Sequence, residues 1–218
     1  MKPVVTPFHP LFFAKITEVD LARPIDETTQ TAIERAMDEY AVCVLPGQHL
    51  EDEELIAFSR LYGALEAEPD IGPKAGTGGR SRRIAYREIF DISNLDENGS
   101  IVGENEARSS LLQITQLWHT DLSFRQGPAK WSMLHAKVIP PAGGDTEYAD
   151  TRAAYDALPD AMKRRLEGRV VLERRRDSAR TEIACRSSVE KEPRQYAVGC
   201  PLRLFRTTLC PRWPLATR

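Results

Sequence analysis

The chain has 218 residues, of which 41% are hydrophobic and 28% charged, so it is long enough for one globular domain with a sizeable core. The net charge is -2 and the pI is about 6.1, which indicates neither a nucleic-acid partner nor an anionic membrane. No apolar run approaches the roughly 20 residues of a membrane span. The four cysteines form no CxxC pair, so we expect no zinc ribbon or disulfide framework and a reducing, cytoplasmic location.

The first part of the chain predicts alternating strands and helices. Residues 15–21 alternate apolar and polar side chains, as in a half-buried strand. Asp26 is placed to cap a helix whose apolar residues share one face: Ala32, Ile33, Ala36, Met37 and Tyr40. Residues 41–45 are an apolar run typical of a buried strand, and residues 51–63 predict a second helix with an acidic first turn.

The middle of the chain predicts loops, short strands and further helices. Residues 66–83 are rich in glycine, proline and charge; a surface loop is favoured over a phosphate loop, because the GK[ST] ending is missing. The elements expected after it are strands at 83–92, 131–139 and 145–150, and helices at 151–158 and 159–168. In the strand at 131–139 we expect Leu134, Ala136 and Val138 to face the core. This pattern favours a β-rich core with helices outside it.

The composition changes abruptly near Gly168. Residues 169–218 hold 12 basic and 5 acidic side chains, a net of +7, whereas residues 1–168 hold 18 basic and 27 acidic ones, a net of -9. Beyond a strand beginning at 169–173, this basic part shows no sustained period. We therefore divide the chain into a core at 1–168 and an atypical tail at 169–218. Translation in a shifted reading frame is favoured for the tail, and a genuine basic tail is the alternative.

The stretch "QLWHTDLSF" carries the main candidate site. In an extended strand, residues i and i+2 point to the same face, so His119 and Asp121 would present a nitrogen and a carboxylate oxygen side by side. These are two of the three ligands of a facial triad on Fe(II), which leaves positions for a co-substrate and O₂. An isolated HxD is common, and capping or a salt bridge is its ordinary role.

The surrounding motifs narrow these alternatives. "LWHTDLSF" together with "PAKWSMLHAKVIPPAGGDTEYADTRAAYDALP" closely resembles the taurine/2,4-dichlorophenoxyacetate dioxygenase (TauD/TfdA) family, over about the first three-quarters of the chain. The resemblance implies an Fe(II)- and 2-oxoglutarate-dependent dioxygenase. It also implies an α+β, mainly β fold, a double-stranded β-helix or jelly roll with flanking helices, incomplete at its C-terminal end here. "GGDTEYADTRAAYDALP" looks more like the herbicide-degrading branch than the sulfonate branch.

The same resemblance implies roles for particular residues. His119 and Asp121 would be the first two iron ligands, and the Thr146 hydroxyl would bind the 2-oxoglutarate carboxylate farthest from iron. O₂ and 2-oxoglutarate would be consumed to CO₂ and succinate while an unactivated C–H of the substrate is hydroxylated. In the herbicide branch, the hydroxylated ether carbon then collapses to a phenol and glyoxylate.

The family's second histidine and the arginine that follows it are missing. The four histidines are His9, His49, His119 and His135, so none lies far downstream. His135 is expected to be a satisfied or solvent-facing histidine rather than a substitute ligand. No arginine of the tail matches the family's arginine motif. Without the missing part, the barrel would also have open edges.

Three functions therefore stay open. The first is a dioxygenase hydroxylating a small carboxylic acid, most like 2,4-dichlorophenoxyacetate dioxygenase, with a taurine or sulfonate dioxygenase as the variant. The second is a catalytically inactive, truncated remnant of such an enzyme. The third is a non-catalytic β-barrel binding module. The expected partner is a small-molecule substrate, without nucleic acid or membrane, and a homo-oligomer is possible.

Overall fold

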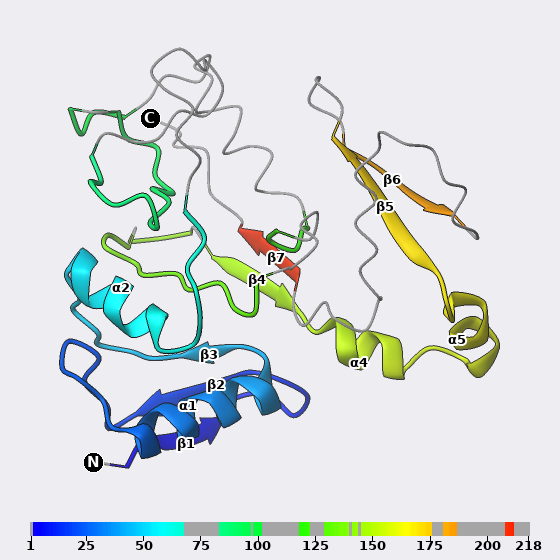
Figure 1. Cartoon of the computed structure of the whole chain (residues 1–218), viewed down its shortest axis with the longest axis horizontal. Helices are drawn as coiled ribbons and strands as arrows, with labels where there is room; N and C mark the ends of the chain where they lie inside the picture. Colours follow the sequence, from blue (N-terminus) through cyan, green and yellow to red (C-terminus); the bar gives the residue numbers. More distant parts are fainter. Residues whose placement is uncertain are drawn as a thin grey trace. The chain divides into compact units, whose positions relative to one another are not determined.

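The structure is a computed structural model of the whole chain. It describes residues 2–67, 83–96, 98–101, 118–122, 129–139, 141–143, 145–175, 181–186 and 208–211. The chain divides into two compact units (Figure 1). The first unit is Met1–His119 with Met133–Glu147 and Leu209–Arg218, and the second is Thr120–Ser132 with Tyr148–Thr208.

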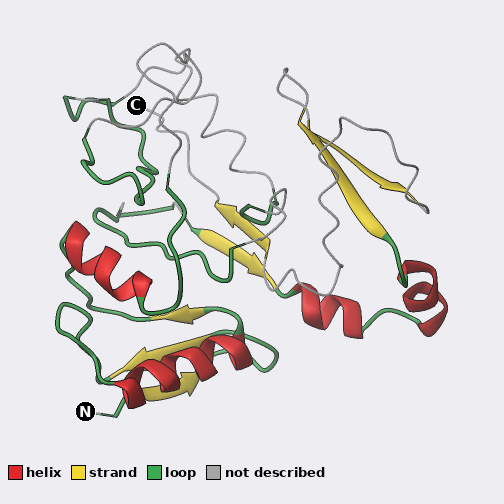
Figure 2. Cartoon of the chain, viewed as in Figure 1, coloured by secondary structure: helices red, strands yellow, loops and turns green. Residues whose placement is uncertain are grey.

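A three-stranded sheet lies in the first unit. β1 (Val4–Pro7) pairs antiparallel with β2 (Ala14–Thr17), and β2 pairs parallel with β3 (Cys43–Val44), in the order β1-β2-β3. Parallel neighbours need a crossover connection. The helix α1 (Glu27–Tyr40) supplies it and lies against the sheet (Figure 2). Both predicted strands are therefore present, although each is shorter than the sequence pattern indicated.

The predicted cap and face of α1 are confirmed. The Asp26 carboxylate accepts a hydrogen bond of 2.7 Å from the Thr29 backbone N–H, which satisfies a helix-end donor. Ile33 and Ala36, both from the predicted apolar face, are only 2% and 3% exposed. The helix stops where Ala41 adopts a left-handed φ of 62° and donates its N–H to the Met37 carbonyl.

The second predicted helix is α2 (Asp52–Arg60). The Glu51 side chain accepts from the third helical N–H, and Glu54 accepts from the Glu51 N–H, so the two close a capping box. Acidic residues fill the first turn, where the helix dipole favours them. Its inward face joins the core of the first unit, which consists of Ile16, Leu21, Ile33, Ala36, Leu50 and Phe58.

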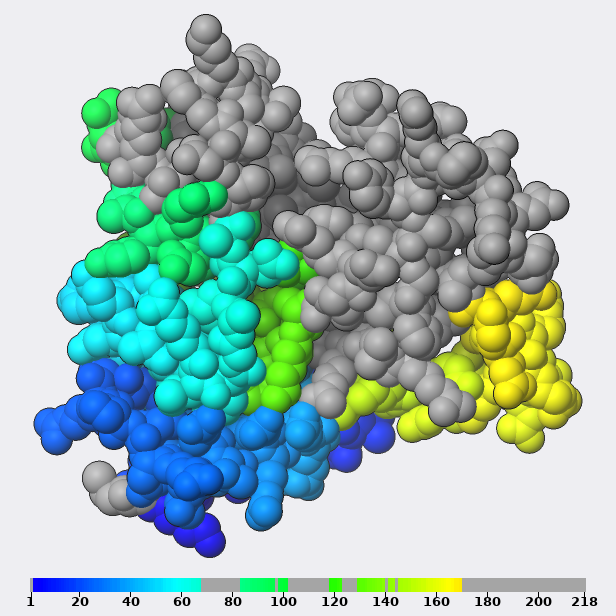
Figure 3. Space-filling view, in the orientation of Figure 1, coloured from blue at the N-terminus to red at the C-terminus, as the bar shows by residue number. Residues whose placement is uncertain are grey.

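Residues 131–139 form no strand, contrary to the prediction. Residues 133–139 lie against the α2 segment within the first unit (Figure 3). The Ser59 hydroxyl donates to Met133 Sδ at 3.1 Å, and Lys137 donates to the Leu50 carbonyl at 2.7 Å. The expected core face is also reversed. Leu134 is 55% and Val138 84% exposed, while Met133 packs against the core.

Residues 83–95 likewise form no strand, and a single bridge joins Leu95 to Ile101. Polar contacts to α2 hold this segment instead. The Tyr86 hydroxyl donates to the Glu53 carboxylate, and Arg60 pairs with Glu88 at 3.0 Å. These bonds hold the side chains of the segment without a backbone ladder, so the strand predicted at 83–92 is absent.

The remaining elements follow residue 145. β4 (Thr146–Ala149) leads to α4 (Thr151–Asp156) and α5 (Asp160–Leu166), as predicted, and β5 (Val170–Arg175) confirms the strand expected after Gly168. β5 pairs antiparallel with β6 (Thr181–Arg186), and β4 pairs with β7 (Thr208–Pro211). The last two strands lie in the basic tail, where the sequence predicted no element.

The described residues thus combine small sheets with flanking helices, which confirms the coarse prediction of an α+β chain. No described helix has the length and hydropathy needed to cross a bilayer.

Candidate functional site

The two proposed iron ligands lie on either side of the boundary between the units. His119 closes the long segment of the first unit and is half-buried. Asp121 belongs to the second unit, is also half-buried, and forms a turn with Leu122, whose φ is +53°. The expectation of one extended strand through both residues is therefore wrong at Asp121.

A tyrosine that the sequence analysis missed lies near Asp121 in the second unit. Tyr148 of β4 is half-buried. Burial raises the pKa of its phenol, and the negative charge of Asp121 raises it further. A charge that is felt in this way lies within a short distance of the ring. The alternation of "DTEYAD" marks Tyr148 as a residue on the same strand face as Thr146 and Asp150, and this was the available signal.

Thr146, the proposed 2-oxoglutarate contact, is the first residue of β4 and is exposed. It is grouped with the first unit. An exposed hydroxyl is available to a ligand.

Asp150 is buried but already bound. Its carboxylate caps α4 by accepting from the Arg152 N–H at 2.9 Å, and the Arg152 guanidinium reaches both carboxylate oxygens at 3.2 Å. The side chain of Asp150 is only 4% exposed, so its negative charge is compensated mainly by the Arg152 guanidinium and little by water. Its role is to fix the β4–α4 corner, and it is not a free metal ligand.

His135 points to the loop before α2. Its Nε2 lies 3.3 Å from the Gln48 carbonyl oxygen, and no described residue binds its buried Nδ1. The ring is half-buried, and one of its two nitrogens has a described partner. Lys137, two residues on, pairs with Asp52 at 3.2 Å. These contacts attach His135 to the frame of the first unit.

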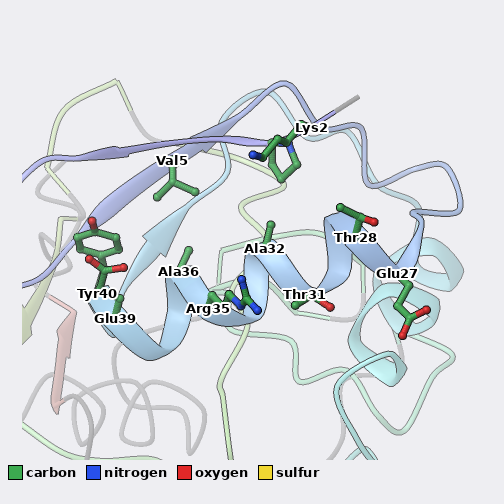
Figure 4. Close-up of a pocket in the computed structure, with 11 residues that line it drawn as sticks. Lys2, Val5, Glu27, Thr28, Thr31, Ala32, Arg35, Ala36, Glu39 and Tyr40 are labelled. Atoms are coloured by element: carbon green, nitrogen blue, oxygen red, sulfur yellow. The ribbon is translucent and has the colours of Figure 1, made fainter.

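A separate surface pocket of about 670 Å³ lies between α1 and β1. Figure 4 shows Val5 of β1 opposite Ala32 and Ala36 of the helix. Lysine, arginine and glutamate side chains of both signs surround this apolar floor. None of the residues predicted for iron or 2-oxoglutarate lines it, so the pocket is not the candidate metal site.

The donors do not complete an iron site of the expected kind. Within the described ranges, no three side chains of histidine, cysteine, aspartate or glutamate lie together as metal ligands would. The whole chain holds four histidines, and the last of them is His135. A facial triad needs two histidines and one carboxylate, so His119 and Asp121 leave it one nitrogen short.

Comparison with known proteins shows what the chain is related to. The profile described as "Taurine catabolism dioxygenase TauD, TfdA family" matches residues 5–198, which include His119, Asp121 and Thr146. The chain belongs to the TauD/TfdA family. The resemblance drawn from "WHTD" and "GGDTEYAD" is thereby confirmed, and the match ends 30 residues beyond Gly168.

Two curated relatives place this TauD/TfdA member more closely. It is 44% identical, over 169 residues, to the alpha-ketoglutarate-dependent 2,4-dichlorophenoxyacetate dioxygenase of Cupriavidus pinatubonensis, an alignment that covers 77% of this chain and 57% of that protein. It is 42% identical to the enzyme of the same name from a Burkholderia species, over 73% of this chain and 52% of that protein. The chain therefore spans little more than half the length of these relatives.

A solved structure shares the fold. The crystal structure of AAD-2 in complex with Mn(II) and N-oxalylglycine superposes with a TM-score of 0.70 and 34% identity. The superposition covers 79% of this chain and 58% of that one.

Proposed function

We propose that this chain is part of an Fe(II)- and 2-oxoglutarate-dependent dioxygenase that acts on a small aryloxyalkanoic acid. The observation that carries the proposal is the 44% identity to a 2,4-dichlorophenoxyacetate dioxygenase. His119 and Asp121 would bind the metal, and Thr146 would bind the distal carboxylate of 2-oxoglutarate. When bound, the metal and 2-oxoglutarate supply the oxidation of the substrate with O₂. The complete domain would have the double-stranded β-helix fold, in a cytoplasmic enzyme.

The chain's own contribution is binding and orientation. His119 offers an imidazole nitrogen and Asp121 a carboxylate oxygen, a donor pair suited to a divalent first-row metal. Tyr148, held in the second unit with Asp121, would limit the access of water to that carboxylate because its ring is half-buried there. Asp150 and Arg152 would hold the corner between β4 and α4, and so keep Thr146 and Tyr148 on one ordered strand.

An assay of succinate tests this proposal. The protein is incubated with Fe(II), 2-oxoglutarate and O₂, with 2,4-dichlorophenoxyacetate in one series and taurine in another. We expect more succinate with the aryloxy acid, and none for His119→Ala or Asp121→Asn. Equal succinate with both acids would overturn the substrate class, and activity unaffected by both substitutions would overturn the site.

The inactive remnant is the second candidate, and the missing second histidine of the triad favours it. Absence of succinate with either acid is the result expected of an inactive polypeptide. Thermal stabilisation by 2-oxoglutarate without turnover would then favour a non-catalytic binding module over a remnant. Whether residues 169–218 are a shifted reading frame is a separate proposal. The encoding DNA tests it, because another frame after Gly168 should then encode a histidine and an arginine in the family pattern.

A further inference from the structure

We infer that Pro3 and Pro7 close the outer edge of β1 to pairing with any further strand, including that of a second copy. The inference is independent of the proposed function, because it concerns only the hairpin at the start of the chain. Among the described strands, β1 is the end strand of the order β1-β2-β3 (Figure 1). The outward backbone groups of an end strand are a template for pairing with another chain, so proteins protect them.

Backbone hydrogen bonds establish which N–H groups of β1 face outward. Successive residues of an antiparallel strand direct their N–H groups alternately toward the partner strand and away from it. The Phe8 N–H donates across the hairpin to the Phe13 carbonyl, just before β2, at 2.9 Å. The Ala14 N–H, opposite Pro7, donates to the Val42 carbonyl at 2.9 Å and so points away from β1. The N–H side of residues 4, 6 and 8 therefore faces β2, and that of residues 3, 5 and 7 faces outward.

Two of these three outward positions are proline, which has no N–H to donate. Val5 lies between them and keeps the single outward donor. A further strand would therefore find a donor at Val5 but none at Pro3 or Pro7, and a ladder cannot extend from one residue. The inward donors of Val4 and Thr6 are untouched, so the prolines block the outer side of β1 without weakening its pairing with β2.

No charged side chain protects this part of the chain. Residues 3–14 contain no lysine, arginine, aspartate or glutamate, although such charges are a common guard of sheet edges. Val4, Val5 and Thr6 are β-branched and favour the extended conformation. An uncharged run of this composition is prone to aggregate when its edge is open. The prolines supply the missing protection, and strand partners of this sheet are thereby restricted to its β3 side.

Hydrogen exchange of the parent chain, followed by NMR, tests the edge directly. The amides of Thr6 and Phe8 are directed across the hairpin, whereas the Val5 amide should be bonded only to water. We expect Val5 to exchange at least about a hundredfold faster than Thr6 and Phe8. Equal exchange rates of the three amides would overturn the inference, because they would mean that the outer side of β1 is already paired or that the alternation is absent.

Alanine variants supply the missing donors. Pro7 is exposed, so Pro7→Ala removes little packing, and Pro3→Ala/Pro7→Ala restores a donor at every outward position. Two copies related by a two-fold axis through Val5 can then pair their outer edges, with residue 3 of one copy opposite residue 7 of the other. We expect exchange at Val5 in the double variant to slow by at least about tenfold as the protein concentration is raised, with a matching rise in sedimentation coefficient.

Pro10→Ala is the matched control, because Pro10 is an exposed proline of the same hairpin that lies in the β1–β2 connection. It should leave both the exchange at Val5 and the sedimentation coefficient as in the parent. Exchange at Val5 that stays fast at every concentration in both Pro7→Ala and the double variant would refute the protective role of the prolines. Equal slowing in Pro10→Ala would refute it as well, since any loss of proline would then suffice.

Discussion

Nε2 of His135 and the carbonyl oxygen of Gln48 lie 3.3 Å apart, which joins two segments 87 residues apart in the chain. Gln48 is at the same time bound to a third segment. Its side chain accepts from the Leu21 N–H at 2.9 Å and donates to the Val19 carbonyl at 3.0 Å. One side chain and its own carbonyl thus connect the β2–α1 loop, the loop before α2 and residues 131–139.

Substituting Gln48 by alanine should therefore lower stability more than an ordinary surface change. The variant leaves the part-buried Leu21 N–H and Val19 C=O without their partners, at a cost of about 1–3 kcal/mol. Urea unfolding followed by tryptophan fluorescence measures it. Gln30→Ala is the control, since it removes a single exposed bond to the Leu61 carbonyl. Equal losses for the two variants would contradict the connecting role of Gln48.

Ile16 should be the most sensitive apolar position of the first unit. It is fully buried on β2, between α1 and the rest of the core. Ile16→Ala removes buried methyl groups and leaves a cavity, which typically costs about 2–5 kcal/mol. Ile101→Ala, at 69% exposure, should change the unfolding free energy by no more than about 0.5 kcal/mol. A small loss at Ile16 would mean that the core is not formed as described.

The cap at Asp26 should give α1 a pH-dependent stability. Hydrogen bonds from Thr29 lower the pKa of the Asp26 carboxyl in the folded chain. Its contribution is therefore present above the ordinary carboxyl pKa and is lost as the pH falls through the lowered value. Melting temperatures of the parent and Asp26→Ala should differ at neutral pH and converge in acid. Asp26→Asn, which caps without titrating, should differ from Asp26→Ala at both pH values.

Cys43 should react slowly with alkylating agents. Burial raises the pKa of its thiol to about 11, whereas an unfolded cysteine has a pKa of about 8.5. At pH 8.5 the folded chain should therefore alkylate at Cys43 about a hundredfold more slowly than the urea-unfolded chain, since only the thiolate reacts. Peptide mass spectrometry measures both rates. Up to pH 9.5 the folded rate should still rise without a plateau, and an early plateau would show an ordinary pKa.

Local signals in the sequence were sufficient to predict where the helices α1 and α2 begin. Asp26 and the Glu51–Glu54 pair mark where α1 and α2 begin, because capping depends on a few neighbouring residues. Residues 131–139 show the opposite case. Their alternation was read correctly as two faces, but which face is buried depends on Ser59 and Leu50, more than 70 residues away.

In the candidate site, too, features set by neighbouring residues were predictable and features set by distant residues were not. The motifs around His119 and Thr146 were sufficient to predict the family, which the match over residues 5–198 confirms. The turn at Asp121 was not predictable, because Leu122 adopts a left-handed φ of +53° that no glycine or asparagine announces. Tyr148 was missed because its proximity to Asp121 is a tertiary relation.

The side-chain contacts of residues 133–137 should restrict which changes in sequence this segment tolerates during evolution. A strand in a regular ladder can slip by two residues and still pair, because every backbone unit offers the same groups. Met133, His135 and Lys137 instead each meet a different partner: a hydroxyl, a carbonyl and a carboxylate. A one-residue deletion among them would misplace the anchors beyond it, so insertions and deletions should be excluded here even where substitutions are accepted.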